Sequence, residues 1–145
     1  MKPKHTPPPV IVIDPVTAAA VGTSKPWVAD CEFLFSVKTL ARQYQASVVL
    51  VTHPRKGRAK AVGMDELAGG AAYQRFSHTI LWLENPKEDK EVTIKKQGVR
   101  FSTEVNRVLH LMKTRNGRGC GMAIGMDFER ATLKLVEQGV ILSKA

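Results

Sequence analysis

Val10-Ile11-Val12-Ile13-Asp14-Pro15 determines the fold class that the sequence predicts, because four apolar residues follow one another without alternation before an acid and a proline. Such a run is typical of a central strand in a parallel sheet, which is buried on both faces. A second apolar run, residues 47–52, ends on His53. Between the two runs, residues 28–45 carry apolar side chains at helical spacing. Strand, helix and strand in this order predict a right-handed parallel crossover unit.

Further strands are expected along the rest of the chain. A third strand is predicted at residues 79–83, weak strand signals occur at residues 92–94 and at Phe101, and residues 107–112 give a strong one. Short strands covering one edge of the sheet are expected near the end, at residues 122–126, 132–136 and 140–142. The sequence thus predicts an α/β fold with a mostly parallel sheet, flanking helices and C-terminal antiparallel strands. Residues 1–9 are rich in proline and are expected to be a tail or linker stub, which leaves one domain over residues 10–145.

Composition restricts the partners and the compartment. The formal net charge of +9 favours a polyanionic partner such as nucleic acid. Cys31 and Cys120 form no C-x-x-C motif, so neither a zinc site nor a disulfide framework is indicated, and a reduced, cytoplasmic setting is expected. No secretory leader is expected, and no run approaches the roughly 18 apolar residues of a membrane span, so no membrane partner is expected.

Two candidate site residues follow the two apolar runs. Asp14 and His53 would both stand at the carboxyl ends of parallel strands, where open α/β sheets bind ligands. A carboxylate in that position suits a phosphate-bound magnesium ion. The simpler alternatives are that Asp14 caps the following turn and that His53 hydrogen-bonds a turn.

Basic side chains form two further candidate sites. The segment after His53 carries four cations with two glycines and no acid, namely Arg55, Lys56, Arg58 and Lys60. Such a segment suits contacts with nucleic acid phosphates, although charge runs are usually solvated surface. The strand at residues 107–112 runs directly into Lys113-Thr114-Arg115-Asn116-Gly117, where two cations stand one residue apart. A strand end can hold such a pair toward a phosphate of another molecule, and the alternative is a hairpin with basic side chains in solvent.

The ordered set of motifs resembles the second half of a RecA-like ATPase core, most of all hexameric replicative helicases of the DnaB and RepA kind. The resemblance covers residues 10–128 and rests on the strand to Asp14, the strand to His53, the basic segment, Glu66-Leu67-Ala68-Gly69-Gly70, the strand to Glu84 and the Lys113 to Gly117 motif. It implies that Asp14 is the Walker B carboxylate on the magnesium side, that His53 is a phosphate sensor and that residues 55–60 lie in a DNA-binding loop. It implies further that Lys113 and Arg115 reach the γ-phosphate bound by an adjacent subunit.

Two parts of that family pattern are missing from this sequence. No Gly-rich loop ends in Gly-Lys-Ser or Gly-Lys-Thr, and neither Glu66 nor Glu84 matches the position of the catalytic glutamate. The chain alone is therefore expected not to hydrolyse ATP. The resemblance implies part of a DNA-dependent ATPase of replication or recombination, with ATP and Mg²⁺ as cofactors of the complete assembly. Its expected partners are single-stranded DNA and either further copies of the chain in a ring, expected to be a hexamer, or a full-length ATPase. The alternative is a non-enzymatic basic module that binds single-stranded nucleic acid or such an ATPase.

Overall fold

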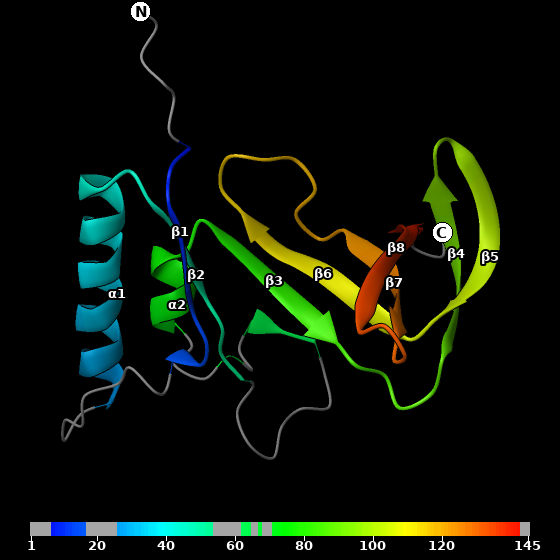
Figure 1. Cartoon of the computed structure of the whole chain (residues 1–145), viewed down its shortest axis with the longest axis horizontal. Helices are drawn as coiled ribbons and strands as arrows, with labels where there is room; N and C mark the ends of the chain where they lie inside the picture. The colour runs from blue at the N-terminus through cyan, green and yellow to red at the C-terminus, as the bar shows by residue number, and fades with distance from the viewer. Residues whose placement is uncertain (1–6, 17–25, 54–61, 65–66, 68–70, 143–145) are drawn as a thin grey trace, which may run out of the picture. The chain divides into compact units, whose positions relative to one another are not determined.

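The computed structural model describes residues 7–16, 26–53, 62–64, 67 and 71–142 (Figure 1). The chain divides into two compact units, Met1–Ser77 and His78–Ala145. Each unit is described below by itself.

The first unit contains β1 (Val10–Ile13), α1 (Pro26–Gln43), β2 (Ser47–Leu50) and α2 (Ala71–Phe76). β1 and β2 pair in parallel, with Val10 opposite Ser47 and Ile13 opposite Leu50, so the predicted parallel pairing of these two strands is present. Proline suits the first position of α1 because the amide that it lacks has no partner there. Gln45, with φ of 50°, ends the helix in the left-handed conformation, and the amide of Ala46 donates 2.8 Å to the carbonyl of Ala41.

The helices and the strands of this unit differ in burial. Leu34 of α1 and Ala72 and Tyr73 of α2 are buried where the two helices pack together. Burial, followed by the charge of Asp30, raises the pKa of Tyr73 to about 12. By contrast, Val10 and Val12 of β1 are 66% and 61% exposed. A parallel sheet is usually covered on both faces, so this apolar strand is open to an additional covering layer.

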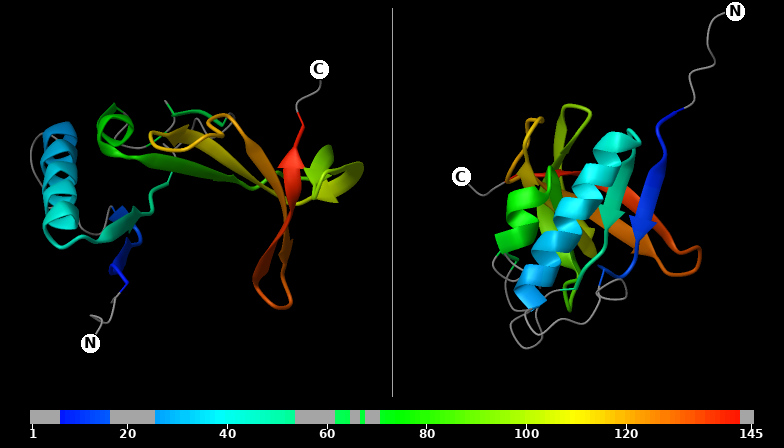
Figure 2. Two further views of the ribbon diagram at one scale, coloured as in Figure 1. Left: turned by 90° about the horizontal axis from the view of Figure 1, so that it is seen from above. Right: turned by 90° about the vertical axis from the view of Figure 1, so that its left-hand side faces the viewer.

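The second unit is an antiparallel sheet of six strands, β3 (Thr79–Glu84), β4 (Lys90–Lys96), β5 (Val99–Val105), β6 (Arg107–Thr114), β7 (Ala123–Glu129) and β8 (Lys134–Ile141). The strand order is β3-β6-β7-β8-β4-β5, so β3 and β5 are the two edge strands. The sheet is strongly twisted, and β4 and β5 run in a different direction from β3 and β6 (Figures 1 and 2).

The core of the second unit lies where the twist of the sheet brings β5 close to β7. Ile94 of β4, Val105 of β5 and Val108 of β6 are at most 2% exposed. Gly125 of β7 allows this close approach, because a Cβ atom there would lie 2.9 Å from Cγ1 of Val105. The middle of the sheet is therefore held together by apolar contacts among four different strands.

The predicted fold class is wrong. The structure is dominated by the antiparallel sheet, and β1 and β2 form the parallel pair by themselves in the part of the chain that the structure describes. The strand predicted at residues 79–83 does form, but it pairs antiparallel with β6. The three short C-terminal strands are in fact two long ones, β7 and β8. Strand direction depends on the partner strand, and a short apolar run carries no information about that partner.

Candidate functional site

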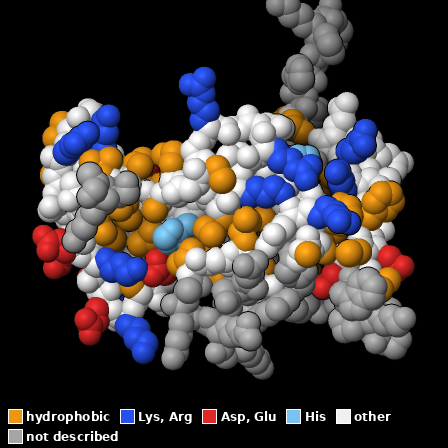
Figure 3. Space-filling view, turned by 180° about the vertical axis from the view of Figure 1, so that it is seen from behind, with side chains coloured by type: hydrophobic (Ala, Val, Ile, Leu, Met, Phe, Trp, Pro, Cys, Tyr) orange, Lys and Arg blue, Asp and Glu red, His pale blue; other side chains and the backbone are white. Residues whose placement is uncertain are grey.

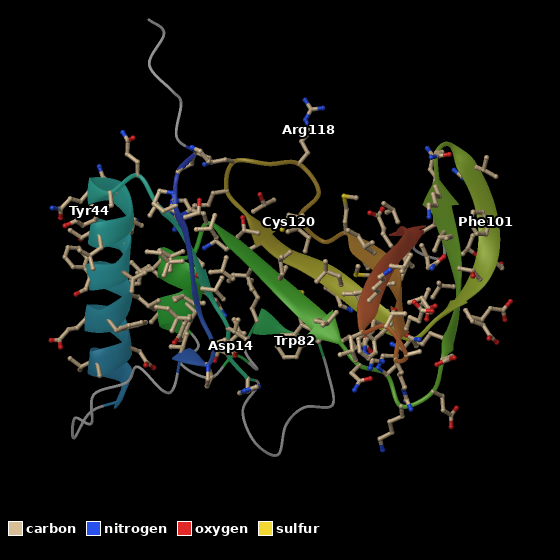
Figure 4. The ribbon with its side chains drawn as sticks, in the orientation of Figure 1. Asp14, Tyr44, Trp82, Phe101, Arg118 and Cys120 are labelled. Carbon is tan, nitrogen blue, oxygen red and sulfur yellow. The ribbon has the colours of Figure 1, made fainter. Side chains whose placement is uncertain are left out.

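Asp14 and His53 belong to the first unit and follow its two parallel strands at the same end of the pair. The ladder continues past the strands, because the amide of Val51 donates 2.9 Å to the carbonyl of Ile13 and the amide of Val16 donates 2.8 Å to the carbonyl of Val51. Asp14 directly follows Ile13, and His53 follows Val51 by two residues. Parallel strands end at a common edge, so both side chains start from that edge. Both residues are exposed, and Figure 4 shows the position of Asp14.

This edge offers one carboxylate and one imidazole to a ligand. Within the described ranges, no three His, Cys, Asp or Glu side chains come together as a metal-binding group. The predicted basic residues Arg55, Lys56, Arg58 and Lys60 lie outside the described residues.

In the second unit, a bulge in β6 sets the position of Lys113. Leu111 lies opposite Leu81, but Lys113 lies opposite Ile80, so the register shifts by one residue at this point. Without the shift Lys113 would face Thr79, and the shift therefore moves it to the face of the sheet that Ile80 occupies. Beyond the strand, the amide of Arg115 donates 3.0 Å to the carbonyl of His78, which holds the backbone of the strand end to the start of β3.

Lys113 and Arg115 form a cationic strand end. Partial burial, and then the positive charge of Arg115, lower the pKa of the Lys113 ammonium below its usual value. The like charges raise the free energy of this strand end, and an anion bound beside both cations would lower it. Arg118 is a third cation nearby and is exposed on the loop that follows (Figure 4).

The loop after the cationic strand end returns directly to the sheet. The amide of Leu111 donates 2.8 Å to the carbonyl of Met122, and the amide of Gly121 donates 2.8 Å to the carbonyl of Leu111. Gly119 has φ of +107°, and a Cβ atom there would lie 2.5 Å from the sulfur of Met122. The backbone conformation therefore favours glycine at this position, and a larger residue would also have to displace the flexible side chain of Met122. The base of the loop is fixed, which keeps the end of β6 in place.

Glu84 is held by two residues that the sequence did not associate with it. Nζ of Lys90 lies 2.5 Å from its Oε1, and Nε2 of His110 lies 2.9 Å from its Oε2. The three residues come from β3, β4 and β6, and His110 is 26 positions from Glu84. Both carboxylate oxygens of Glu84 are therefore bound within the sheet, which indicates that Glu84 stabilises the fold. No local sequence pattern predicts the contact of Glu84 with His110, because it depends on the pairing of β3 with β6.

The sequence carries 22 Lys and Arg residues against 13 Asp and Glu residues, which gives the net charge of +9. Figure 3 shows side chains of both signs exposed on one face. A scan against models of known protein families finds no match, and a search of curated proteins finds no similar sequence. None of the helices in the described part of the chain combines the length and the apolar character that crossing a membrane would require.

Proposed function

We propose that this chain is a component of a DNA-dependent ATPase of the helicase type, which acts in DNA replication or recombination. The observation that carries the proposal is the common edge from which Asp14 and His53 leave the parallel pair. Ligands of α/β proteins bind beyond the carboxyl ends of parallel strands, so a carboxylate and an imidazole there can act on one ligand. The bulge of β6 and the two cations after it give the proposal independent support.

The residues present fit one part of a magnesium–ATP complex. Asp14 offers an exposed carboxylate for the magnesium side, and Lys113 and Arg115 offer donors that suit phosphate oxygens. Mg²⁺ bound with ATP would neutralise charge on the phosphates. The sequence contains no Gly-Lys-Ser or Gly-Lys-Thr loop to cradle those phosphates. We therefore assign no hydrolysis step to the residues of this sequence, and a loop that cradles the phosphates would have to be supplied from outside it.

Each candidate residue has a role in such an assembly. Arg115 stabilises negative charge on a phosphate bound by a neighbouring subunit, because its guanidinium is planar and always charged. His53 hydrogen-bonds a phosphate oxygen and couples the loss of phosphate to the basic segment, residues 55–60, that binds single-stranded DNA. The neighbouring subunit is another member of a ring, as in the hexameric helicases that the sequence resembles, or a full-length ATPase.

Calorimetric titration of the purified chain with magnesium–ATP tests the proposal. We expect weak binding, in the millimolar range of Kd, because the cradle is missing. Asp14→Asn should remove the dependence of this binding on magnesium. Replacing both Lys113 and Arg115 by Ala should change the binding far less, because these cations act on nucleotide that a neighbouring subunit holds. Arg130→Ala and Asp89→Asn, at exposed turn positions, are the matched controls. The proposal would be overturned if all variants bound magnesium–ATP equally, or if neither the wild type nor any variant bound it.

The second candidate is a non-enzymatic module that binds single-stranded nucleic acid. The absence of a phosphate-cradling loop from the sequence and the net charge of +9 favour it. The same preparation distinguishes the two candidates. Binding of single-stranded DNA without any measurable binding of magnesium–ATP would favour the module.

A further inference from the structure

β5 is a long and regular edge strand. It has one neighbour, β4, and pairs with it over all seven residues from Val99 to Val105 without a register shift. Natural edge strands are commonly protected by shortness, by proline or by a bulge, and β5 has none of these devices. Its outer side therefore presents a row of backbone groups that can pair with another strand.

Apolar side chains on β5 also face solvent. Val99 is 62% exposed and Phe101 is 43% exposed, and the two residues lie on the same face because they are two positions apart. Figure 4 shows Phe101 on the outermost strand of this unit. An added strand would cover part of both side chains.

The opposite face of the β4–β5 ribbon carries charges in an unusual order. Lys95 lies directly opposite Arg100, and Glu91 lies directly opposite Glu104. Like charges facing each other across a strand pair destabilise the pair. In the part of the chain covered by the structure, no ion pair to any of these four side chains is found. On this face the ribbon is thus positive near its turn and negative at its other end, and neither pair of like charges has an opposite charge beside it.

We propose that β5 pairs antiparallel with β5 of a second copy of this chain, with the two-fold axis at Ser102. In this register Arg100 lies opposite Glu104 of the second copy, and Glu104 lies opposite its Arg100, because the two residues are symmetric about Ser102. Each row across the four strands then reads Lys95, Arg100, glutamate, glutamate, so that the repulsion within each ribbon is offset by attraction between the ribbons.

The charge order is what selects this partner. A charged residue on an edge strand commonly prevents pairing, since an identical strand would meet a like charge. Here the two charges have opposite sign and lie on the same face four residues apart, so an antiparallel copy meets the opposite charge at both positions. On the other face Phe101 lies opposite Thr103 of the second copy and diagonal to its Phe101, within reach of an aromatic contact. The surface is self-complementary, as an isologous dimer requires.

Reversing the charge of Arg100 or Glu104 should weaken the dimer without destabilising the monomer. Arg100→Glu would face Lys95 within its own ribbon, and Glu104→Arg would face Glu91, so each single variant should unfold at the same temperature as the wild type or higher when monomeric. Each variant would however place like charges together twice in the dimer. We expect sedimentation velocity over a concentration series to show a dimer for the wild type, with the dimer Kd raised by roughly tenfold or more in each single variant.

Combining Arg100→Glu with Glu104→Arg should restore the dimer, since opposite charges again face each other. Arg130→Glu, an equal charge change at an exposed turn, should leave the dimer Kd unchanged. The result that overturns the proposal is a wild type that stays monomeric, or an association that none of the β5 charges affects. The latter would be expected for a ring contact through Arg115, so failure here would leave the proposed function standing.

A cysteine at the two-fold axis tests the register. Cys31 and Cys120 are first replaced by Ser, because both are free thiols. Ser102→Cys should then give a disulfide-linked dimer on mild oxidation, because the two positions face each other across the axis. Thr93→Cys is the matched control, since Thr93 lies opposite Ser102 on the inner strand β4. Equal cross-linking of both variants, or none in Ser102→Cys, would rule out this register.

Discussion

Nε2 of His110 lies 2.9 Å from Oε2 of Glu84, and Nζ of Lys90 holds the other oxygen of the same carboxylate. Burial of the carboxyl group raises its pKa, but the hydrogen bonds and charges of Lys90 and His110 outweigh burial, so that the pKa of Glu84 is lowered from its usual 4.5. The charged carboxylate is therefore stabilised in the folded state, where it connects β3, β4 and β6.

This connection predicts an acid-sensitive part of the stability. A carboxyl group whose folded pKa is lowered contributes stability that is present above its unfolded pKa, near 4.5, and is lost as the pH falls through the folded value. Glu84→Gln should therefore lower the free energy of unfolding by about 1 kcal/mol at pH 7 and by much less at pH 3. Urea unfolding at both pH values measures the difference. Glu88→Gln, an exposed residue of the following turn, is the control. A loss of equal size at both pH values would show that the charge of Glu84 is irrelevant.

Gly125 gives a prediction about the core of the second unit. A Cβ atom there would lie 2.9 Å from Cγ1 of Val105 and 3.6 Å from atoms of Ile94 and Ile141. Gly125→Ala should therefore reduce the free energy of unfolding by about 1–3 kcal/mol, because the buried neighbours leave no space for an added methyl group. Chemical denaturation measures this value.

The double variant Gly125→Ala, Val105→Ala identifies the cause. If the contact with Val105 is responsible, adding Val105→Ala should cost less in the Gly125→Ala background than in the wild type. Gly63→Ala serves as a control, because a Cβ atom at Gly63 meets no atom within 4 Å. Strict additivity of the two changes would point to backbone strain in β7 instead.

Individual helices and strands were predictable where the residues of one continuous segment carry the signal. The apolar run at Val10, the helical spacing before Gln45 and the strand predicted at residues 107–112 all carry a local signal, and all three elements form. The β4–β5 hairpin also has a local signal that was not used to predict it. Gln97 and Gly98 both have positive φ, which is the conformation of a two-residue hairpin turn, and Gly is favoured at the second position of such a turn.

The candidate site was predictable only in part. Asp14 and His53 were assigned to one edge because parallel strands end together, and this follows from the pairing of β1 with β2 alone. The position of Lys113 was not predictable, since it depends on the bulge of β6 beside Ile80 and Leu81, and no residue type there indicates a bulge. The contact of His110 with Glu84 likewise depends on strand pairing over a long separation in sequence. Side chains that meet only through such pairing cannot be found from spacing.

The basic segment at residues 55–60 gives a prediction that rests on charge alone, because it lies outside the described residues. If it binds single-stranded DNA through phosphates, affinity should fall steeply with salt and depend little on base sequence, since counterions are released at each contact. Each lost contact should flatten the slope of log affinity against log salt by about 0.7. Lys56→Ala combined with Arg58→Ala should thus flatten it by roughly twice that amount in fluorescence anisotropy titrations at several salt concentrations. Lys87→Ala combined with Arg130→Ala removes the same charge from exposed turns of the sheet and should leave the slope unchanged. An equal flattening in both pairs would mean that the chain binds through its overall charge, whereas no change in either would place the DNA contact on other residues.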